Sequence, residues 1–135
     1  MIAPDSSVLV AALAQWHPVH GASRTAIAGE ERVLVGHVAF EATSVLSRMP
    51  EPYRMTPAVV IEALERIFTP PWLTLDAAGQ RSCLHRAIAE GLSGGALYDA
   101  LIAATASEHN ATLLSADRRA RVAYQAMGAS VSYVE

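Results

Sequence analysis

The chain of 135 residues is 52% hydrophobic and 17% charged, with one cysteine and a formal net charge of −3. These values fit one cytoplasmic domain spanning residues 1–135, and they exclude a disordered chain, a disulfide framework and, since no apolar run reaches ~18 residues, a membrane span. All ten basic residues are arginine, and the absence of lysine excludes a P-loop nucleotide site and Schiff-base chemistry.

Short apolar strands alternate with helical patterns along the chain. In order, the sequence predicts a strand at 2–4, helices over 8–14 and 18–29, a strand at 32–35, and helices over 38–48 and 57–68. A strand at 72–75, helices over 77–91 and 96–109, a strand at 112–115, a helix over 118–127 and a strand at 131–134 follow. Thr56 and Asp76 are predicted to cap the helices that they precede. This order predicts the α/β class, a three-layer α/β/α sandwich with a central parallel β-sheet.

Carboxylates gather at the expected binding edge of this sheet. Asp5 and Asp117 each follow a predicted strand, and ligands of open parallel sheets bind beyond the carboxyl ends of the strands. Asp99 and Glu41 lie on helical faces that are otherwise apolar. Burying a lone carboxylate costs several kcal/mol unless it is paired or metal-bound. A hard divalent cation with oxygen ligands is the simplest shared partner.

Structural roles for the same acids stay open at this point. Asp5 and Asp117 could each serve only as the cap of the helix that follows. Asp99 and Glu41 could instead pair with arginines.

Four segments carry a resemblance to a known family. They are MIAPDSSVL at the start, FEA around Glu41, YDALIAATA around Asp99 and LLSAD ending at Asp117. Together they resemble the PIN-domain ribonucleases, in particular the VapC-type toxins of bacterial toxin–antitoxin pairs. The resemblance spans essentially the whole chain, and DALIAATA is its most specific part. It implies a metal-dependent endoribonuclease that hydrolyses RNA phosphodiester bonds and leaves a 5′-phosphate and a 3′-hydroxyl.

The resemblance also assigns roles to individual residues. It gives the family's four acidic positions, around one or two Mg²⁺ or Mn²⁺ ions, to Asp5, Glu41, Asp99 and Asp117. Asp5 and Asp99 are expected as direct ligands, and the other two as ligands of a second ion or as groups that orient water. Ser6 and Ser115 are expected as supporting hydroxyls. Pro4 departs from the family pattern because it lacks a backbone donor just before Asp5, which is tolerable only where the strand ladder ends.

Three arginines follow the last of these acids. Arg118, Arg119 and Arg121 lie at the start of a predicted helix, where the helix dipole disfavours cations. Their position predicts contacts with RNA phosphates. The alternative is a solvated face that balances the acid cluster.

The apolar composition predicts that another chain covers part of the surface. The segment Thr56–Phe68 and the region of Trp72 are candidates, because Ile61, Ile67 and Phe68 widen the apolar stripe beyond one helix face. The resemblance implies a homodimer and a cognate antitoxin, whose amphipathic helix would dock there and send a basic side chain towards the acids. Two other interpretations remain, namely a PIN nuclease of RNA processing without an antitoxin and a non-catalytic RNA- or protein-binding domain.

Overall fold

The computed structural model describes residues 1–29 and 31–135. Its elements are β1 (Ile2–Pro4), α1 (Ser6–Leu13), α2 (His20–Ile27), α3 (Gly36–Ser47), α4 (Pro57–Ile67), α5 (Ala77–Ala89), α6 (Ala96–Glu108), β2 (Thr112–Ser115), the 3₁₀ helix η1 (Arg118–Ala120), α7 (Arg121–Ala126) and β3 (Val131–Tyr133). Among these residues, no helix is both long and apolar enough to cross a bilayer.

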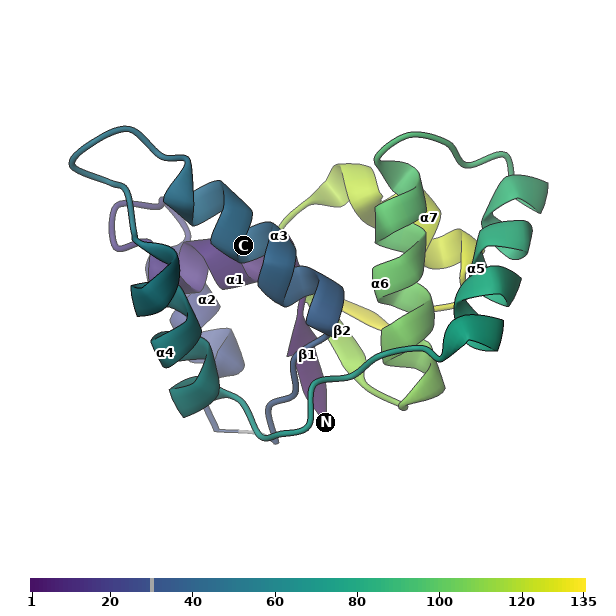
Figure 1. Ribbon diagram of the computed structural model, residues 1–135, viewed down its shortest axis with the longest axis horizontal. Coiled ribbons are helices and arrows are strands. Elements are labelled where there is room, and N and C mark those ends of the chain that lie inside the picture. Colours follow the sequence, from purple (N-terminus) through teal and green to yellow (C-terminus); the bar gives the residue numbers. More distant parts are fainter. Residues whose placement is uncertain (30) are drawn as a thin grey trace.

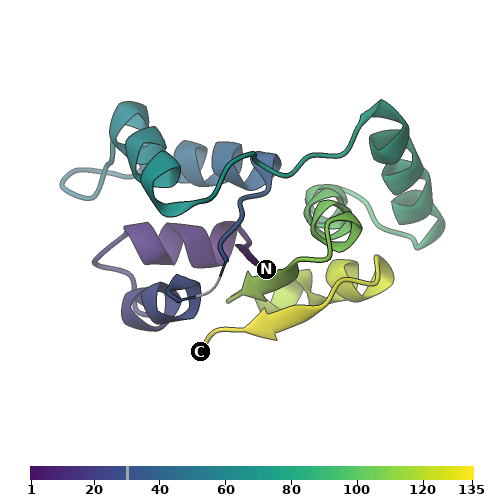
Figure 2. The same cartoon turned by 90° about the horizontal axis from the view of Figure 1, so that it is seen from below.

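The three strands form a parallel sheet in the order β1-β2-β3. In its register, Ala3 lies opposite Leu113, and Leu113 lies opposite Val131. Helices α1 to α4 lie on one side of the strands and α5 to α7 on the other, as Figure 1 shows and the second view in Figure 2 repeats. The expected α/β sandwich with a parallel sheet is therefore confirmed.

Two of the five predicted strands are wrong as strands. The segments 32–35 and 72–75 form only single parallel bridges, one between Ile2 and Arg32 and one between Val35 and Leu73. Their β-branched and apolar side chains favour extended backbone, but too few backbone groups pair for either segment to continue the ladder. Both segments still extend the sheet beyond β1.

The hydrogen bonds of β1 show why Pro4 is tolerated. Ile2 donates to the Glu31 carbonyl on the side of segment 32–35, whereas the Asp5 amide donates to the Leu114 carbonyl at 2.8 Å on the side of β2. Successive residues of a strand alternate in direction, so Pro4 faces the same side as Ile2. Within the part of the chain that the structure describes, β1 bridges that segment at Ile2 and Arg32 alone. The missing donor therefore faces a ladder that has ended, and β2 holds Asp5.

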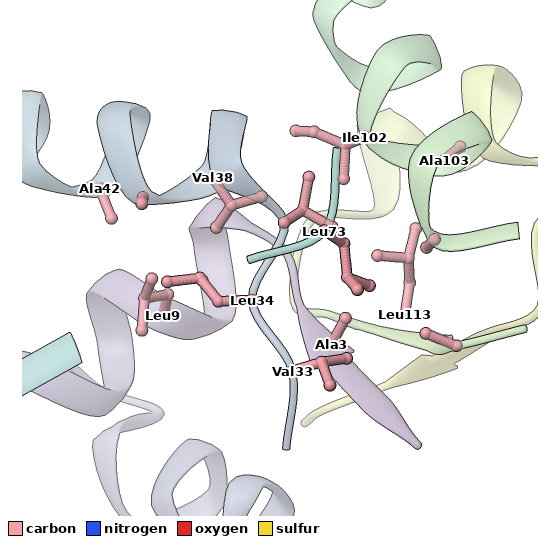
Figure 3. Packing of buried hydrophobic residues seen from close by; sticks show 14 of the residues in the cluster. Ala3, Leu9, Val33, Leu34, Val38, Ala42, Leu73, Ile102, Ala103 and Leu113 are labelled. Atoms are coloured by element: carbon pink, nitrogen blue, oxygen red, sulfur yellow. The ribbon is translucent and has the colours of Figure 1, made fainter. Parts of the chain in front are cut away.

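Helices from the two sides of the sheet meet over the carboxyl ends of the strands. The core cluster in Figure 3 joins Ala3 of β1 and Leu113 of β2 to Leu9 of α1, and all three side chains are fully buried. Val38 of α3 and Ile102 of α6 belong to the same cluster, and α3 contacts α6 directly. The small side chains along α6 permit this close packing, which places Glu41 and Asp99 at the same edge as Asp5.

One surface expectation is wrong. Phe68 is only 4% exposed and packs in the core, so it does not widen an outer apolar stripe. It directly follows α4 and caps its C-terminus, with its amide donating to the Leu64 carbonyl. The large exposed apolar side chains of this region are Phe40 on α3, at 76%, and Val59 and Ile61 on α4, at 51% and 36%.

Candidate active site

Asp5 is held at the start of α1 by three hydrogen bonds. Its Oδ1 accepts from the Val8 amide at 3.1 Å and from the Ser7 hydroxyl at 2.5 Å. Its Oδ2 accepts from the hydroxyl of Tyr124 on α7 at 2.7 Å. The residue is 2% exposed. Asp5 therefore caps α1, which is the structural role left open for it above. Its second oxygen, Oδ2, takes no part in the cap and bonds to α7 instead.

Serine hydroxyls tie this residue to the end of β2. Ser7 Oγ, besides donating to Asp5, accepts from the Ala116 amide at 2.9 Å. Ser115 is fully buried, and its Oγ accepts from the Asp117 amide at 3.1 Å. Ser115 thus shapes the loop that carries Asp117 through backbone contacts. Ser7, which the sequence analysis did not single out, contacts a site carboxylate directly.

Glu41 reaches the same edge from α3. Its Oε1 accepts from the Ser6 hydroxyl at 2.6 Å, which links α3 to α1. Its Oε2 lies 3.6 Å from His37 Nε2, one turn earlier on the helix. The His37 ring stacks on Tyr98 of α6, with centroids 5.1 Å apart and planes 3° apart. The Glu41 side chain is 34% exposed, so it lines the surface of the site more than the core.

Asp99 lies in the first turn of α6 and has the most perturbed carboxyl group. Burial is the main cause that raises its pKa to about 6. The negative charges of Glu41, Asp117 and Asp5, in that order, raise the pKa further, and Arg119 lowers it. Like charges act in this way only at short range. The four acids that the sequence analysis selected are thus brought within electrostatic range of one another.

Asp117 and the arginines after it bond largely among themselves. Asp117 Oδ1 accepts from the Arg119 amide at 2.9 Å and lies 3.3 Å from Arg119 Nε. Arg118 pairs with Glu135, and its guanidinium lies 4.9 Å from the centre of the Tyr133 ring. Arg121 is exposed. Local partners therefore account for the positions of two of the three arginines without an RNA phosphate.

Within the described residues, no ion pair joins Asp99 or Glu41 to an arginine. In the same part of the chain, no three His, Cys, Asp or Glu side chains are gathered closely enough to enclose a metal ion by themselves. The carboxylates form an open, oxygen-only cluster. Mg²⁺ keeps several waters and takes few protein carboxylates, so such a cluster suits it better than a closed cage would.

A groove adjoins the acids between α1, α3 and η1. Its volume is about 760 Å³, and its lining includes Ser6, Ser7, Asp117, Arg118 and Arg119. Hydroxyl, carboxylate and guanidinium groups therefore share one concave surface. That combination suits an anionic substrate that approaches a cation held by the acids.

The structure adds Tyr124, which the sequence analysis did not select. In the sequence, Tyr124 is only a tyrosine beside Ala123 on a predicted helix, four residues before Gly128. A buried tyrosine hydroxyl normally requires a partner. Nothing in the sequence identifies Asp5, 119 residues away, as that partner.

The family model of the PIN domain matches residues 2–125. The chain belongs to the PIN-domain family. It is 40% identical over 134 residues to the ribonuclease VapC40 of Mycobacterium tuberculosis, covering 99% of each chain. It is 36% identical over 131 residues to ribonuclease VapC27 of the same species, covering 96% of this chain and 94% of the relative. The resemblance found from the motifs is thereby confirmed.

Solved structures share the PIN fold at low sequence identity. FitAcB from Neisseria gonorrhoeae superposes with a TM-score of 0.69 at 21% identity, covering 97% of this chain and 96% of that one. VapBC2 from Rickettsia felis, bound to a DNA fragment of its promoter, gives a TM-score of 0.70 at 14% identity over 100% of both chains. At such identities the likeness concerns the fold.

Proposed function

We propose that this PIN-domain protein is an endoribonuclease that hydrolyses RNA phosphodiester bonds and serves as the toxin of a toxin–antitoxin pair. The observation that carries the proposal is the meeting of Asp99 of α6 with three other carboxylates, which come from the end of β1, from α3 and from the loop after β2. Its near full-length relatives, which are named ribonucleases, support the same reaction. RNA as substrate makes the cytoplasm the expected place of action.

The acid cluster fits Mg²⁺ or Mn²⁺ as its cofactor. Carboxylate oxygens are the ligands that these hard cations prefer, and at neutral pH four neighbouring carboxylates repel one another unless a cation is present. Asp5 and Asp99 are proposed as direct ligands, with Glu41 and Asp117 holding a second ion or acting through waters. When bound, the ion would polarise the phosphate and offset charge on the leaving oxygen.

The protein groups around the acids have distinct tasks in this proposal. Ser6 holds Glu41, and Ser7 holds Asp5, so two carboxylates are oriented before substrate arrives. Arg119 is 93% exposed and lies beside Asp117, where an RNA phosphate in the groove would meet it. Arg118 and Arg121 would extend that contact along the strand.

We expect the arginines to act on RNA affinity rather than on the chemical step. The double variant Arg119→Gln/Arg121→Gln should weaken binding and flatten its salt dependence by about 0.7 in slope for each lost phosphate contact. Turnover at saturating RNA should change much less. Filter binding at several salt concentrations measures the slope. Arg66→Gln/Arg81→Gln, which removes the same charge from exposed positions on α4 and α5, is the control. If the salt dependence of binding keeps the same slope, these arginines belong to an ordinary solvated face and do not contact RNA.

An apolar groove between α3 and α4 is the proposed docking place for the antitoxin. It has a volume of about 310 Å³, and Phe40, Pro57, Ile61 and Trp72 are among its lining residues. The apolar face of an amphipathic helix fits such a groove. Glu41 directly follows Phe40 in α3, so a helix seated there lies within reach of the acids. An arginine from that helix would satisfy their charge and compete with the metal.

A second apolar surface suggests the homodimer. Leu84 and Ile88 of α5 are 49% and 60% exposed, and Tyr98 of α6 is 54% exposed. If two copies pair through this surface, the unaltered protein should scatter light as a dimer at micromolar concentration, and Ile88→Glu should scatter as a monomer. Val122→Glu, at a 69% exposed position on α7, is the control and should remain dimeric. A monomeric mass for the unaltered protein would rule the dimer out.

Sequencing of RNA ends after induced expression tests the proposed function. The unaltered protein should create new ends that begin with a 5′-phosphate, and Asp99→Asn should create none. Growth arrest relieved by the product of a short adjacent reading frame would identify the toxin role. Cleavage without such a gene would indicate RNA processing, and the absence of new ends would indicate a binding domain.

A further inference from the structure

The hydrogen bonds of Asp5 leave few positions for a cation. An ionised carboxylate has about four lone-pair sites, two on each oxygen. The Val8 amide and the Ser7 hydroxyl occupy both sites of Oδ1, and Tyr124 occupies one site of Oδ2. One lone pair, on Oδ2, therefore remains free to bind a cation. The oxygen that remains available is thus the one that Tyr124 contacts.

Tyr124 is built into the fold so that its hydroxyl remains a donor. The side chain is 1% exposed and packs in the main core cluster. Burial first, and then the charge of Asp5 and the hydrogen bond to it, raise the pKa of Tyr124 far above its ordinary range. Its hydroxyl donates to Asp5 Oδ2 at 2.7 Å.

We propose that Tyr124 is a positioning residue of the cation site, whose hydroxyl fixes Asp5 Oδ2 in the direction from which it binds the ion. This inference rests on the proposed metal-dependent function. The terminal torsion of an aspartate is broad, and a turn about its Cβ–Cγ bond moves both oxygens, so the bond from Tyr124 to Oδ2 adds a restraint to the two bonds on Oδ1. Groups that orient a metal ligand in this way contribute about 10- to 100-fold to metal affinity.

The alternative is that Asp5 merely satisfies the buried hydroxyl of a core tyrosine. In that case, removing the hydroxyl would change the stability of the fold and leave cation affinity alone. The two roles are therefore separated by metal affinity, measured on the protein without RNA.

The experiment titrates the metal-free protein with Mn²⁺ and follows the free ion by electron paramagnetic resonance. Tyr124→Phe keeps the ring and removes the hydroxyl, and it should bind Mn²⁺ about 10- to 100-fold more weakly than the unaltered protein. Tyr53→Phe removes a hydroxyl at a 48% exposed position where the ring packs on Trp16, and it should bind as the unaltered protein does.

Each outcome decides the matter. Equal or tighter Mn²⁺ binding by Tyr124→Phe, even with a lowered melting temperature, overturns the positioning role and leaves the proposed function standing. Absence of Mn²⁺ binding by the unaltered protein overturns the metal site itself and the inference with it.

Should Tyr124→Phe fail to fold, fluorotyrosine labelling of the unaltered protein replaces it. The ¹⁹F resonance of position 124, assigned by elimination from variants of the other three tyrosines, should shift on saturation with Mg²⁺. If the ¹⁹F resonance of position 124 does not shift on saturation with Mg²⁺, the inference is overturned.

Discussion

Replacing Asp99 with asparagine should reduce RNA cleavage by at least about a hundredfold while the fold stays intact. The substitution keeps the size and hydrogen-bonding capacity of the side chain but removes the charge that a hard cation requires. Single-turnover cleavage of labelled RNA in Mg²⁺ buffer measures the loss. Asp76→Asn is the matched control, because Asp76 caps α5 at an exposed position and belongs to no acid cluster. It should cut at the unaltered rate.

Metal-limited buffer makes this test more stringent. A variant that has lost only part of its metal affinity regains activity when Mg²⁺ is raised, so the comparison is made at low and at high concentration. Equal cleavage by Asp99→Asn and by the unaltered protein at low Mg²⁺ would show that the proposed site is not where hydrolysis occurs.

The same substitution should stabilise the metal-free protein at neutral pH. The pKa of Asp99 is about 6 in the folded protein, against an ordinary value of 3.8. The folded state therefore binds the proton more tightly than the unfolded state does, and this contribution to stability is complete below pH 3.8 and is lost as the pH rises through about 6. At neutral pH the unaltered protein carries the full repulsion among its acids, whereas Asp99→Asn does not.

Melting temperatures in chelator show this effect as a difference between the two proteins. Asp99→Asn should melt higher than the unaltered protein at pH 7.5, and the difference should shrink towards pH 4. Adding Mg²⁺ at pH 7.5 should raise the melting temperature of the unaltered protein more than that of the variant. Asp76→Asn should give no gain at pH 7.5. A difference that is independent of pH would mean that Asp99 does not face the other carboxylates.

Local signals in the sequence were sufficient for much of the fold. Thr56 and Asp76 cap α4 and α5 as expected, accepting from the amides three residues later. The apolar runs at β1 and β2 predict strands, and the acids that follow those strands lie at one edge because parallel strands end together. These features depend on neighbours within a few residues, which a sequence displays directly.

Features that depend on distant partners could not be read in this way. The segments at 32–35 and 72–75 have the composition of strands. Whether they pair as strands depends on how many residues of a neighbouring segment run alongside them, and here each pairing is a single bridge. The bond between Tyr124 and Asp5 joins residues 119 positions apart, and no periodic pattern specifies which hydroxyl meets which carboxylate. Arg118 is a similar case, since β3 runs beside β2 and thereby brings Glu135 next to it.

The pairing of β1 with a strand made much later affects when the protein can become active during its synthesis. β1 is made first, yet its partner strand β2 begins at Thr112, and the hydroxyl that holds Asp5 belongs to Tyr124. A ribosome-bound chain that has reached α6 already carries three of the four acids, but it has neither the loop of Asp117 nor the strand that supports Asp5. Incomplete chains are therefore expected to be harmless to RNA. Only a nearly finished chain assembles the site.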